Sequence, residues 1–477
     1  MPPLPVHGPA AGPGLVVLDI VGLTPRALAD MPALRAATAS GFTARLDPVL
    51  PALTCSVQST FLTGQPPARH GAVGNGWYDR ELGEVLMWRQ HNKLVAGEKV
   101  WDIIRRARPG YRVANVCWWY AMGASVDTIV TPRPVYHADG RKSADCYTRP
   151  AALHDRLTTE LGTFPLFSYW GPTAGIASSR WIVEAARRVL SDHDMTLVYL
   201  PHLDYDLQRH GPAAPQARAA AADLDAVLEP LLADAARAGT TVVALSEYGI
   251  TEVSQPVHIN RALREAGLLE IHHQAGRELL DPMASRAFAV ADHQVAHVYV
   301  RERADLPRTR AVLAEVPGIE QLLGRDGLRA HSLDHPRSGD LLAVAAPDAF
   351  FTWYHWFDDC RAPDFARGVE IFRKTGYDPA ELFFDPDDRW VRSRAAVGLL
   401  RKGLGLRYTM NVIPLDARHV RASHGRLPTD AADGPVLLCS DPNPARERLA
   451  AADVQSLLYA LATNHKIAST SFQEAQF

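Results

Sequence analysis

Five short apolar runs constrain the fold of this chain more than any other feature. The runs are GLVVLDIVG (14–22), RVANVCWWY (112–120), MTLVYLPHLD (195–204), TTVVALSEYG (240–249) and GDLLAVAAP (339–347). Nearly continuous apolar character over so few residues is typical of strands that are buried on both faces, as they are in a parallel sheet. We therefore predict a mainly parallel central sheet.

The longer stretches between these runs have helical patterns. Residues 24–41 (TPRALADMPALRAATASG) and the Ala-rich residues 212–239 each end on a Gly suited to a C-terminal cap. Strands that alternate with helices indicate a doubly wound α/β fold with helices on both faces of the sheet. Residues 14–477 are long enough for one catalytic α/β domain, and we expect a single one.

Two regions interrupt this alternation, and both are predicted to be cap-like insertions over the sheet's edge. They are residues 125–175 and 350–395, which are rich in aromatic residues and Pro. Residues 1–13 are rich in Pro and Gly and lack the basic and apolar parts of a signal peptide, so a flexible leader and a cytoplasmic protein are expected.

Composition excludes several classes of function. The net charge is −3 and no basic patch or reader motif is visible, so no nucleic acid polymer is expected as a partner. No apolar run reaches the roughly 18 residues of a membrane helix, so no membrane span is expected. The 5 cysteines are odd in number and scattered, which favours free thiols. The sequence leaves the oligomeric state open.

Polar residues follow three of the apolar runs, where ligands bind in open α/β sheets. Asp19 and Asp204 follow two of them, Glu247 and Tyr248 follow a third, and His424 lies in the loop ASHGRLP. Taken singly, such residues are more often helix caps or loop residues. Converging carboxylates and an imidazole suit a divalent metal such as Zn, Mn or Mg.

The segment PALTCSVQSTFLTGQPPARHGAVGN (51–75) places Thr54, Cys55 and Ser56 side by side, without an adjacent base. A hydroxyl bound directly by a metal is activated without such a base. Cys55 would be a soft ligand among oxygen ligands, and Ser56 is interpreted as a structural hydroxyl. The residues alone leave open which of the three is the nucleophile.

The order of these motifs resembles the alkaline phosphatase superfamily, and more narrowly its nucleotide pyrophosphatase/phosphodiesterase branch. The resembling motifs are a strand ending in Asp, PALTxxxxSTxLTGxxPxxHGxxxN, an Asp followed by Gly-Pro, a strand ending SEYG, and a late SHG loop. The resemblance covers residues 14–267 and 339–425. It implies an α/β sandwich with a capping insertion and two divalent metals, usually zinc, flanking a Thr or Ser nucleophile.

The resemblance assigns roles residue by residue. Asp19 resembles a ligand of the metal on the nucleophile side, and Thr54 resembles the nucleophile that also binds this metal. Asn75 resembles the amide that holds a non-bridging phosphate oxygen. Asp204 and His424 resemble ligands of the second metal.

The family's Asp-x-x-x-His motif is altered in this chain. The Gly-Pro register aligns Asp204 with the Asp and Gln208 with the His, whereas a second frame pairs Asp206 with His210. We prefer the first frame because Asp204 directly follows the strand. Gln is a weak, neutral oxygen ligand, so the second metal would be held less tightly.

The Asp-His pair that the family has after its fourth strand is also altered. Glu247 and Tyr248 stand in its place, so oxygen ligands replace imidazole. Zinc follows from the resemblance, but the oxygen-rich set favours Mn, Mg or Ca, as one ion or two. His293 and His297, in the predicted strand ADHQVAHVYV, are interpreted as structural residues.

These observations predict a metal-dependent hydrolase of phosphate diesters or pyrophosphates, acting through a phospho-threonine at Thr54 on a small phosphate ester. One alternative is a phosphomonoesterase or phosphonate hydrolase of the same superfamily. Another is a non-catalytic protein that binds a phosphorylated metabolite, since two of the expected His ligands are replaced.

Overall fold

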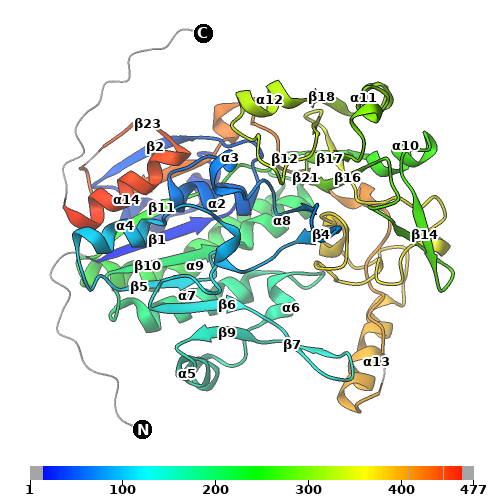
Figure 1. The fold of residues 1–477 in the computed structure, drawn as a ribbon. Helices are drawn as coiled ribbons and strands as arrows, with labels where there is room; N and C mark the ends of the chain where they lie inside the picture. The colour runs from blue at the N-terminus through cyan, green and yellow to red at the C-terminus, as the bar shows by residue number, and fades with distance from the viewer. Residues whose placement is uncertain (1–13, 407, 444, 465–477) are drawn as a thin grey trace.

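A computed structural model describes residues 14–406, 408–443 and 445–464, and its centre is a nine-stranded sheet (Figure 1). The strand order is β23-β2-β22-β11-β1-β10-β5-β6-β9. The five strands from β11 to β6 are parallel, so the prediction of a mainly parallel central sheet is confirmed. The strands of this sheet are β1 (Leu15–Ile20), β2 (Phe42–Asp47), β5 (Val113–Val116), β6 (Thr128–Pro132), β9 (Cys146–Arg149), β10 (Met195–Leu200), β11 (Thr241–Leu245), β22 (Val436–Cys439) and β23 (Arg448–Ala450). The predicted leader, residues 1–13, lies outside the described residues.

Strand β1 lies at the middle of the sheet, and all six of its residues are buried. Asp19 pairs with Tyr199 of β10 on one side and with Leu245 of β11 on the other. Because these three strands are parallel and in register, the residues that follow them meet at the same edge.

The helices pack in two groups, on opposite faces of the sheet (Figure 1). Helices α1, α7, α8 and α9 contact one another on one face, and α2, α4 and α14 do so on the other. The α-helices are α1 (Pro32–Ala37), α2 (Thr54–Thr63), α3 (Pro67–His70), α4 (Val100–Ala107), α5 (Ala152–Leu161), α6 (Leu166–Tyr169), α7 (Ile176–Leu190), α8 (His202–His210), α9 (Pro215–Arg237), α10 (Ile259–Glu265), α11 (Leu306–Ala314), α12 (Arg325–Ala330), α13 (Val391–Gly403) and α14 (Val454–Thr463).

The two helices predicted from sequence have different outcomes. Residues 212–239 form α9, and Gly239 follows it with a left-handed φ of 62°. Residues 24–41 instead form a short 3₁₀ helix, η1 (Ala27–Asp30), and α1, which begins at Pro32. Gly41 caps neither of them. A Cβ at Gly41 would lie 1.8 Å from the carbonyl oxygen of Cys439, so Gly is needed there for strand packing.

The fifth apolar run forms a buried strand, but not in the central sheet. It is the strand β19 of a separate four-stranded sheet with the order β16-β17-β19-β18, in which all neighbours are antiparallel. These strands are β16 (Ala287–Asp292), β17 (Val295–Val300), β18 (Ile319–Leu323) and β19 (Leu341–Ala345). An apolar run reports burial on both faces, and this second sheet provides such burial too.

The remaining strands form two-stranded sheets. They are β3 (Gly76–Asp79) with β4 (Glu84–Met87), β7 (Val135–Tyr136) with β8 (Lys142–Ser143), β12 (Thr251–Glu252) with β21 (Ala422–Ser423), β13 (Gln255–Val257) with β20 (Ala349–Phe351), and β14 (Ile271–Gln274) with β15 (Arg277–Leu280). Residues 125–175 contain β6 and β9, which extend the edge of the central sheet. Residues 350–395 contain the 3₁₀ helix η5 (Pro379–Leu382) and part of α13. In the described part of the chain, no helix is both long and apolar enough to cross a membrane.

Candidate active site

Thr54 is the first residue of α2, a helix in which all ten residues are buried. The loop before it is fixed by the late His424 loop, since Ala52 N donates to the Gly425 carbonyl and His424 Nδ1 donates to the Ala52 carbonyl, at 2.9 and 2.8 Å. The Thr54 hydroxyl lies 2.8 Å from the hydroxyl of Tyr248. Segments nearly 200 and 370 residues later therefore hold the predicted nucleophile in place.

Two carboxylates lie in this part of the site: Glu247, just after β11, interacts with Thr54, and Asp19, in β1, interacts with Glu247. The amide nitrogen of Gln58, one helical turn after Thr54, donates to Asp19 Oδ2 at 2.9 Å and to Glu247 Oε1 at 2.7 Å. The Gln58 carbonyl oxygen accepts from the backbone N–H of Trp119 at 2.8 Å. A backbone N–H can only donate, so the amide is oriented with its NH₂ group toward the acids.

Burial sets the charge of this acid pair. It raises the pKa of Asp19 well above its ordinary value, and the charge of Glu247 raises it further. Burial also raises the pKa of Glu247, while hydrogen bonds with Asp19, Thr54 and Gln58 oppose the rise. Two carboxylates in one buried site favour a bound proton or a bound cation.

A second acid lies on α8. Gln208 Nε2 donates to Asp204 Oδ1 at 2.8 Å, and the hydroxyl of Tyr377 donates to Gln208 Oε1 at 2.7 Å. Burial raises the pKa of Asp204 to about 7. Gln208 is fully buried, whereas His210 is exposed and lies 4.0 Å from Asp206. The structure thus brings Asp204 and Gln208 together and leaves the pair of the second frame on the outer side of the helix.

Four aromatic rings form a stacked column across the site. The ring centroids of Tyr248 and His424 are 3.7 Å apart, those of His424 and His293 are 3.7 Å apart, and those of His293 and Tyr377 are 3.5 Å apart. Burial lowers the pKa of His293 and of His424 well below the ordinary value, so both are neutral at pH 7. The column joins the Thr54 side of the site to the Asp204 side.

His293 is not in a strand, contrary to our interpretation of ADHQVAHVYV. It opens the two-residue turn between β16 and β17, with a positive φ of 61° that favours Gly. Its Nδ1 lies 2.9 Å from Asp292 Oδ1. A non-Gly residue with this conformation costs about 1 kcal/mol or more, and such residues cluster at functional sites. His297, by contrast, is in β17 and bonds the Val73 carbonyl, as a structural residue does.

Asn75 is held at three points. Its Oδ1 accepts from the Cys55 N–H at 3.1 Å, its Nδ2 donates to Asp292 Oδ1 at 3.1 Å, and its backbone N–H donates to Asp292 Oδ2 at 2.9 Å. One hydrogen of the amide nitrogen remains for another acceptor. Asp292 therefore orients both Asn75 and His293.

His70 makes the segment that carries Thr54 and Asn75 sensitive to acid. It is fully buried, its Nδ1 accepts from Ala72 N at 3.1 Å, and its Nε2 lies 3.1 Å from Thr60 Oγ1. Burial lowers the pKa of His70 to about 3. Between pH 6.5 and pH 3 the unfolded chain binds the extra proton, so stability falls as pH falls, by up to about 1.4 kcal/mol per pH unit.

We therefore expect His70→Asn, which keeps an acceptor for Ala72 N, to reduce this pH dependence. Urea unfolding at pH 7 and pH 5 should show that the wild type loses about 2 kcal/mol more than the variant. Parallel losses in the two proteins would contradict the neutral, buried state of His70.

The acid pair fits a hard divalent cation. Asp19 Oδ1 and Glu247 Oε2 are buried and make no hydrogen bond within the described part of the chain. Thr54 and Tyr248 add two hydroxyl oxygens. Oxygen ligands alone suit Mg, Mn or Ca better than Zn. Gln58 donates to the other oxygen of each carboxylate, Asp19 Oδ2 and Glu247 Oε1, so it leaves these two oxygens available.

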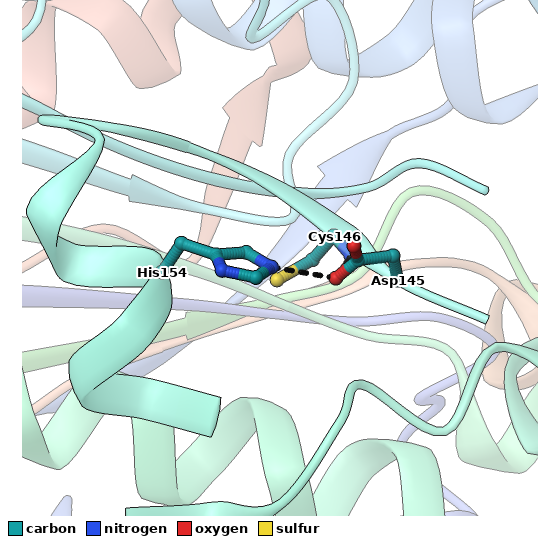
Figure 2. A group of neighbouring side chains, drawn as sticks. All are labelled: Asp145, Cys146 and His154. Carbon is teal, nitrogen blue, oxygen red and sulfur yellow. Dashed lines mark hydrogen bonds and ion pairs between the residues drawn. The ribbon is translucent and has the colours of Figure 1, made fainter. Parts of the chain in front are cut away.

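The Asp204 half offers a single carboxylate, which is bonded to Gln208. Neither half brings three His, Cys, Asp or Glu ligand atoms together, since within residues 14–406, 408–443 and 445–464 such a group occurs only at Asp145, Cys146 and His154. Figure 2 shows this group, in which Asp145 lies just before β9, Cys146 begins β9 and His154 lies on α5. His154 Nε2 forms a 2.7 Å ion pair with Asp145 beside a buried thiol. Burial raises the pKa of Cys146 to about 12, so the group is a protonated thiol next to an ion pair.

Sequence reasoning missed three residues of the site, which are Gln58, Asp292 and Tyr377, and it interpreted a fourth, His293, as structural. None of them directly follows a strand of the central sheet. Of these residues, Gln58 alone could have been found from the sequence. It lies four residues after Thr54, and this spacing places it on the same face of the helix. The others come from the second sheet and from residues 350–395, whose positions no local pattern reports.

Comparison with known proteins agrees with this fold. The family model of type I phosphodiesterase / nucleotide pyrophosphatase matches residues 15–378. Murine ectonucleotide pyrophosphatase / phosphodiesterase 5 (ENPP5) is 15% identical, with 94% of this chain and 95% of that chain covered and a TM-score of 0.56. Another structure of it, 16% identical with the same coverage and a TM-score of 0.55, is an inactive variant in complex with AMP.

A bacterial enzyme is similar to the same extent. Phosphonoacetate hydrolase from Sinorhizobium meliloti 1021, in complex with phosphonoformate, is 16% identical, with 94% of this chain and 96% of that chain covered and a TM-score of 0.59. The solved structures show the fold, and the family model extends over most of the chain, including β1, β10 and β11, whereas the His424 loop lies beyond it. The chain therefore belongs to the type I phosphodiesterase / nucleotide pyrophosphatase family, whose members are phosphoric ester hydrolases of the alkaline phosphatase superfamily.

Proposed function

We propose that this protein hydrolyses phosphate diesters or pyrophosphates, with Thr54 as the nucleophile. The observation that carries the proposal is the position of the Thr54 hydroxyl, at the N-terminus of α2 and beside the acid pair of Asp19 and Glu247. The N-terminus of a ten-residue helix favours an anionic phosphate. Asn75, held by Asp292, has one amide hydrogen left to bind a non-bridging phosphate oxygen.

The residues support two displacements at phosphorus. In the first, Thr54 Oγ forms a bond to phosphorus, the bond to the leaving alcohol or phosphate breaks, and the hydroxyl proton passes toward Glu247. In the second, a water attacks phosphorus from the Asp204 side, the Thr54 Oγ–P bond breaks, and Thr54 Oγ takes back the proton held by Glu247. The proton released by the water passes through Asp204 to solvent, from which the leaving group is protonated. Asp204, with its pKa of about 7, is suited to accept the proton of that water.

Asp19, Glu247 and Thr54 are the residues that would hold a divalent cation. Such a cation lowers the pKa of the Thr54 hydroxyl and screens the charge of the phosphate. With two carboxylates balanced by one dication, a monoanionic diester adds less charge to the buried site than a dianionic monoester does. The described residues offer no Arg or Lys that bonds to Thr54, Asn75 or the acid pair, and this also favours the diester.

A monoesterase or phosphonate hydrolase is the second candidate, favoured by the similarity to phosphonoacetate hydrolase. The AMP in the inactive murine ENPP5 structure favours a nucleotide-like compound as the natural substrate.

The test strips the protein with chelator and adds back Mn, Mg, Ca and Zn separately. Each preparation is assayed on bis(p-nitrophenyl) phosphate and on p-nitrophenyl phosphate. We expect Mn or Mg to restore turnover, with kcat/KM at least about tenfold higher for the diester. A higher value for the monoester would favour the second candidate. Failure of every metal to restore either activity would contradict hydrolysis and favour a non-catalytic binder of phosphorylated metabolites.

A further inference from the structure

The site has two halves, one around Thr54, Asp19 and Glu247 (the nucleophile half) and one around Asp204 (the Asp204 half). Each half contains one glutamine amide that donates to its carboxylates. Gln58 donates to Asp19 and Glu247, and Gln208 donates to Asp204. Both amides are also used at their other end, by Trp119 N and by the Tyr377 hydroxyl. The two halves nevertheless differ in the number of ligand atoms that remain free to bind a cation.

The nucleophile half keeps free ligands even with Gln58 in place. It has two carboxylates, each with one buried oxygen that makes no hydrogen bond in the described part of the chain, and the hydroxyl of Thr54 lies beside them. A dication there neutralises two negative charges, which removes the cost of burying both. Gln58 bonds only the other oxygen of each carboxylate, so its two hydrogen bonds need not be lost.

The Asp204 half lacks this capacity. It has one carboxylate, and the residue one helical turn later is Gln208, whose oxygen is occupied by the Tyr377 hydroxyl. Asp204 and His424 are the two predicted ligands left, and structural or catalytic zinc needs at least three protein ligands. Tyr377 is fixed in turn, because its ring stacks on His293 at 3.5 Å and its backbone N–H donates to the Ala291 carbonyl.

We propose that the site binds a single divalent cation, between Asp19 and Glu247, and that hydrogen bonds from Asp204 through Gln208 to Tyr377 replace the second metal implied by the family resemblance. This rests on the proposed function for the position of the one cation. Tyr377 belongs to the capping segment 350–395, so that segment completes the half of the site from which a metal is excluded. Gln208, the departure from the family motif in this half of the site, is then matched by a tyrosine far away in sequence.

The test counts metal ions in the whole protein in the absence of substrate. Chelator-treated protein is titrated with Mn²⁺, the free ion is followed by electron paramagnetic resonance, and the bound ion is counted by elemental analysis. We expect one Mn²⁺ per chain in the wild type, none in Asp19→Asn, and one in Asp204→Asn with a Kd changed less than about threefold. Asp206→Asn, two residues further on the same helix but outside the site, is the matched control.

A second arm restores the missing imidazole. Gln208→His with Tyr377→Phe, checked for an unchanged circular dichroism spectrum, should bind a second ion when titrated with Zn²⁺. A count that stays at one ion would show that Gln208 and Tyr377 do not exclude the second metal, and would overturn the proposal.

Other outcomes also overturn it. They are two ions in the wild type, no ion at all, or loss of the single ion in Asp204→Asn. Because the count is made without substrate, failure of this proposal is distinct from failure of the proposed function. Two ions with normal turnover leave the hydrolase in place, whereas one ion without turnover on any ester leaves the single-cation site in place.

Discussion

Thr54→Ala is expected to lower kcat for the diester by at least about 10⁴-fold while leaving the fold intact. The substitution removes the oxygen that attacks phosphorus, so the remaining binding groups cannot support two displacements. The lost methyl and hydroxyl are small, and Tyr248, the partner of the hydroxyl, still contacts His424. Thr54→Ser should retain measurable turnover because it keeps the hydroxyl.

The matched control is Cys55→Ala, the neighbouring candidate nucleophile. Burial raises the pKa of Cys55 well above its ordinary value, so the thiol is not ionised at pH 7, and we expect kcat to change less than about threefold. Rapid quench followed by mass spectrometry should find phosphate on the peptide that contains Thr54. Equal loss of activity in Cys55→Ala, or phosphate on another residue, would refute the role of Thr54.

Asp19→Asn is expected to have two opposite effects. Turnover should fall by about 10³-fold because the cation loses one of its two carboxylate ligands. The metal-free protein, in contrast, should become more stable at pH 8, since one of two mutually repelling buried carboxylates is removed. The same substitution should therefore lower turnover and raise the stability of the metal-free protein.

The sign of the second effect follows from the raised pKa of Asp19. The folded state holds the proton more tightly than the unfolded chain, so the wild type loses stability as pH rises through the folded pKa, and the variant does not. Urea unfolding in chelator at pH 5 and pH 8 should therefore show a larger advantage of the variant at pH 8. Asp223→Asn, at an exposed position of α9, is the control. An advantage that does not grow with pH would contradict the buried acid pair.

Much of the fold could be predicted from the sequence because strands that are buried on both faces consist of short apolar runs. The runs at 14–22, 112–120, 195–204 and 240–249 all became neighbouring strands of the central sheet. The run at 339–347 became a strand elsewhere, since an apolar run reports that both faces are covered and not which strands lie beside it. Gly41 shows a similar limit. Its small size serves the approach of the Cys439 carbonyl, and the sequence around it shows only a possible helix end.

The candidate site divides in the same way. The sequence by itself indicated the segment of the predicted nucleophile and the acids near the ends of the strands, because strand order and the αβ alternation bring Asp19, Asp204 and Glu247 to one edge. Only the tertiary structure decided what each acid contacts. Gln58 and Gln208 are ordinary polar helix residues in sequence, and they become the partners of buried carboxylates only when α2 and α8 pack beside the sheet.

The positions of Asp292, His293 and Tyr377 in the site likewise depend on the packing of distant segments. They come from the second sheet and the capping segment, and they reach the site through stacking of rings within 4 Å and through hydrogen bonds to residues far away in sequence. The sequence thus determined which chemical groups are present at the strand ends. The packing of distant segments decided which of those groups remain free for a cation, since a side chain's partners depend on contacts that no local pattern encodes.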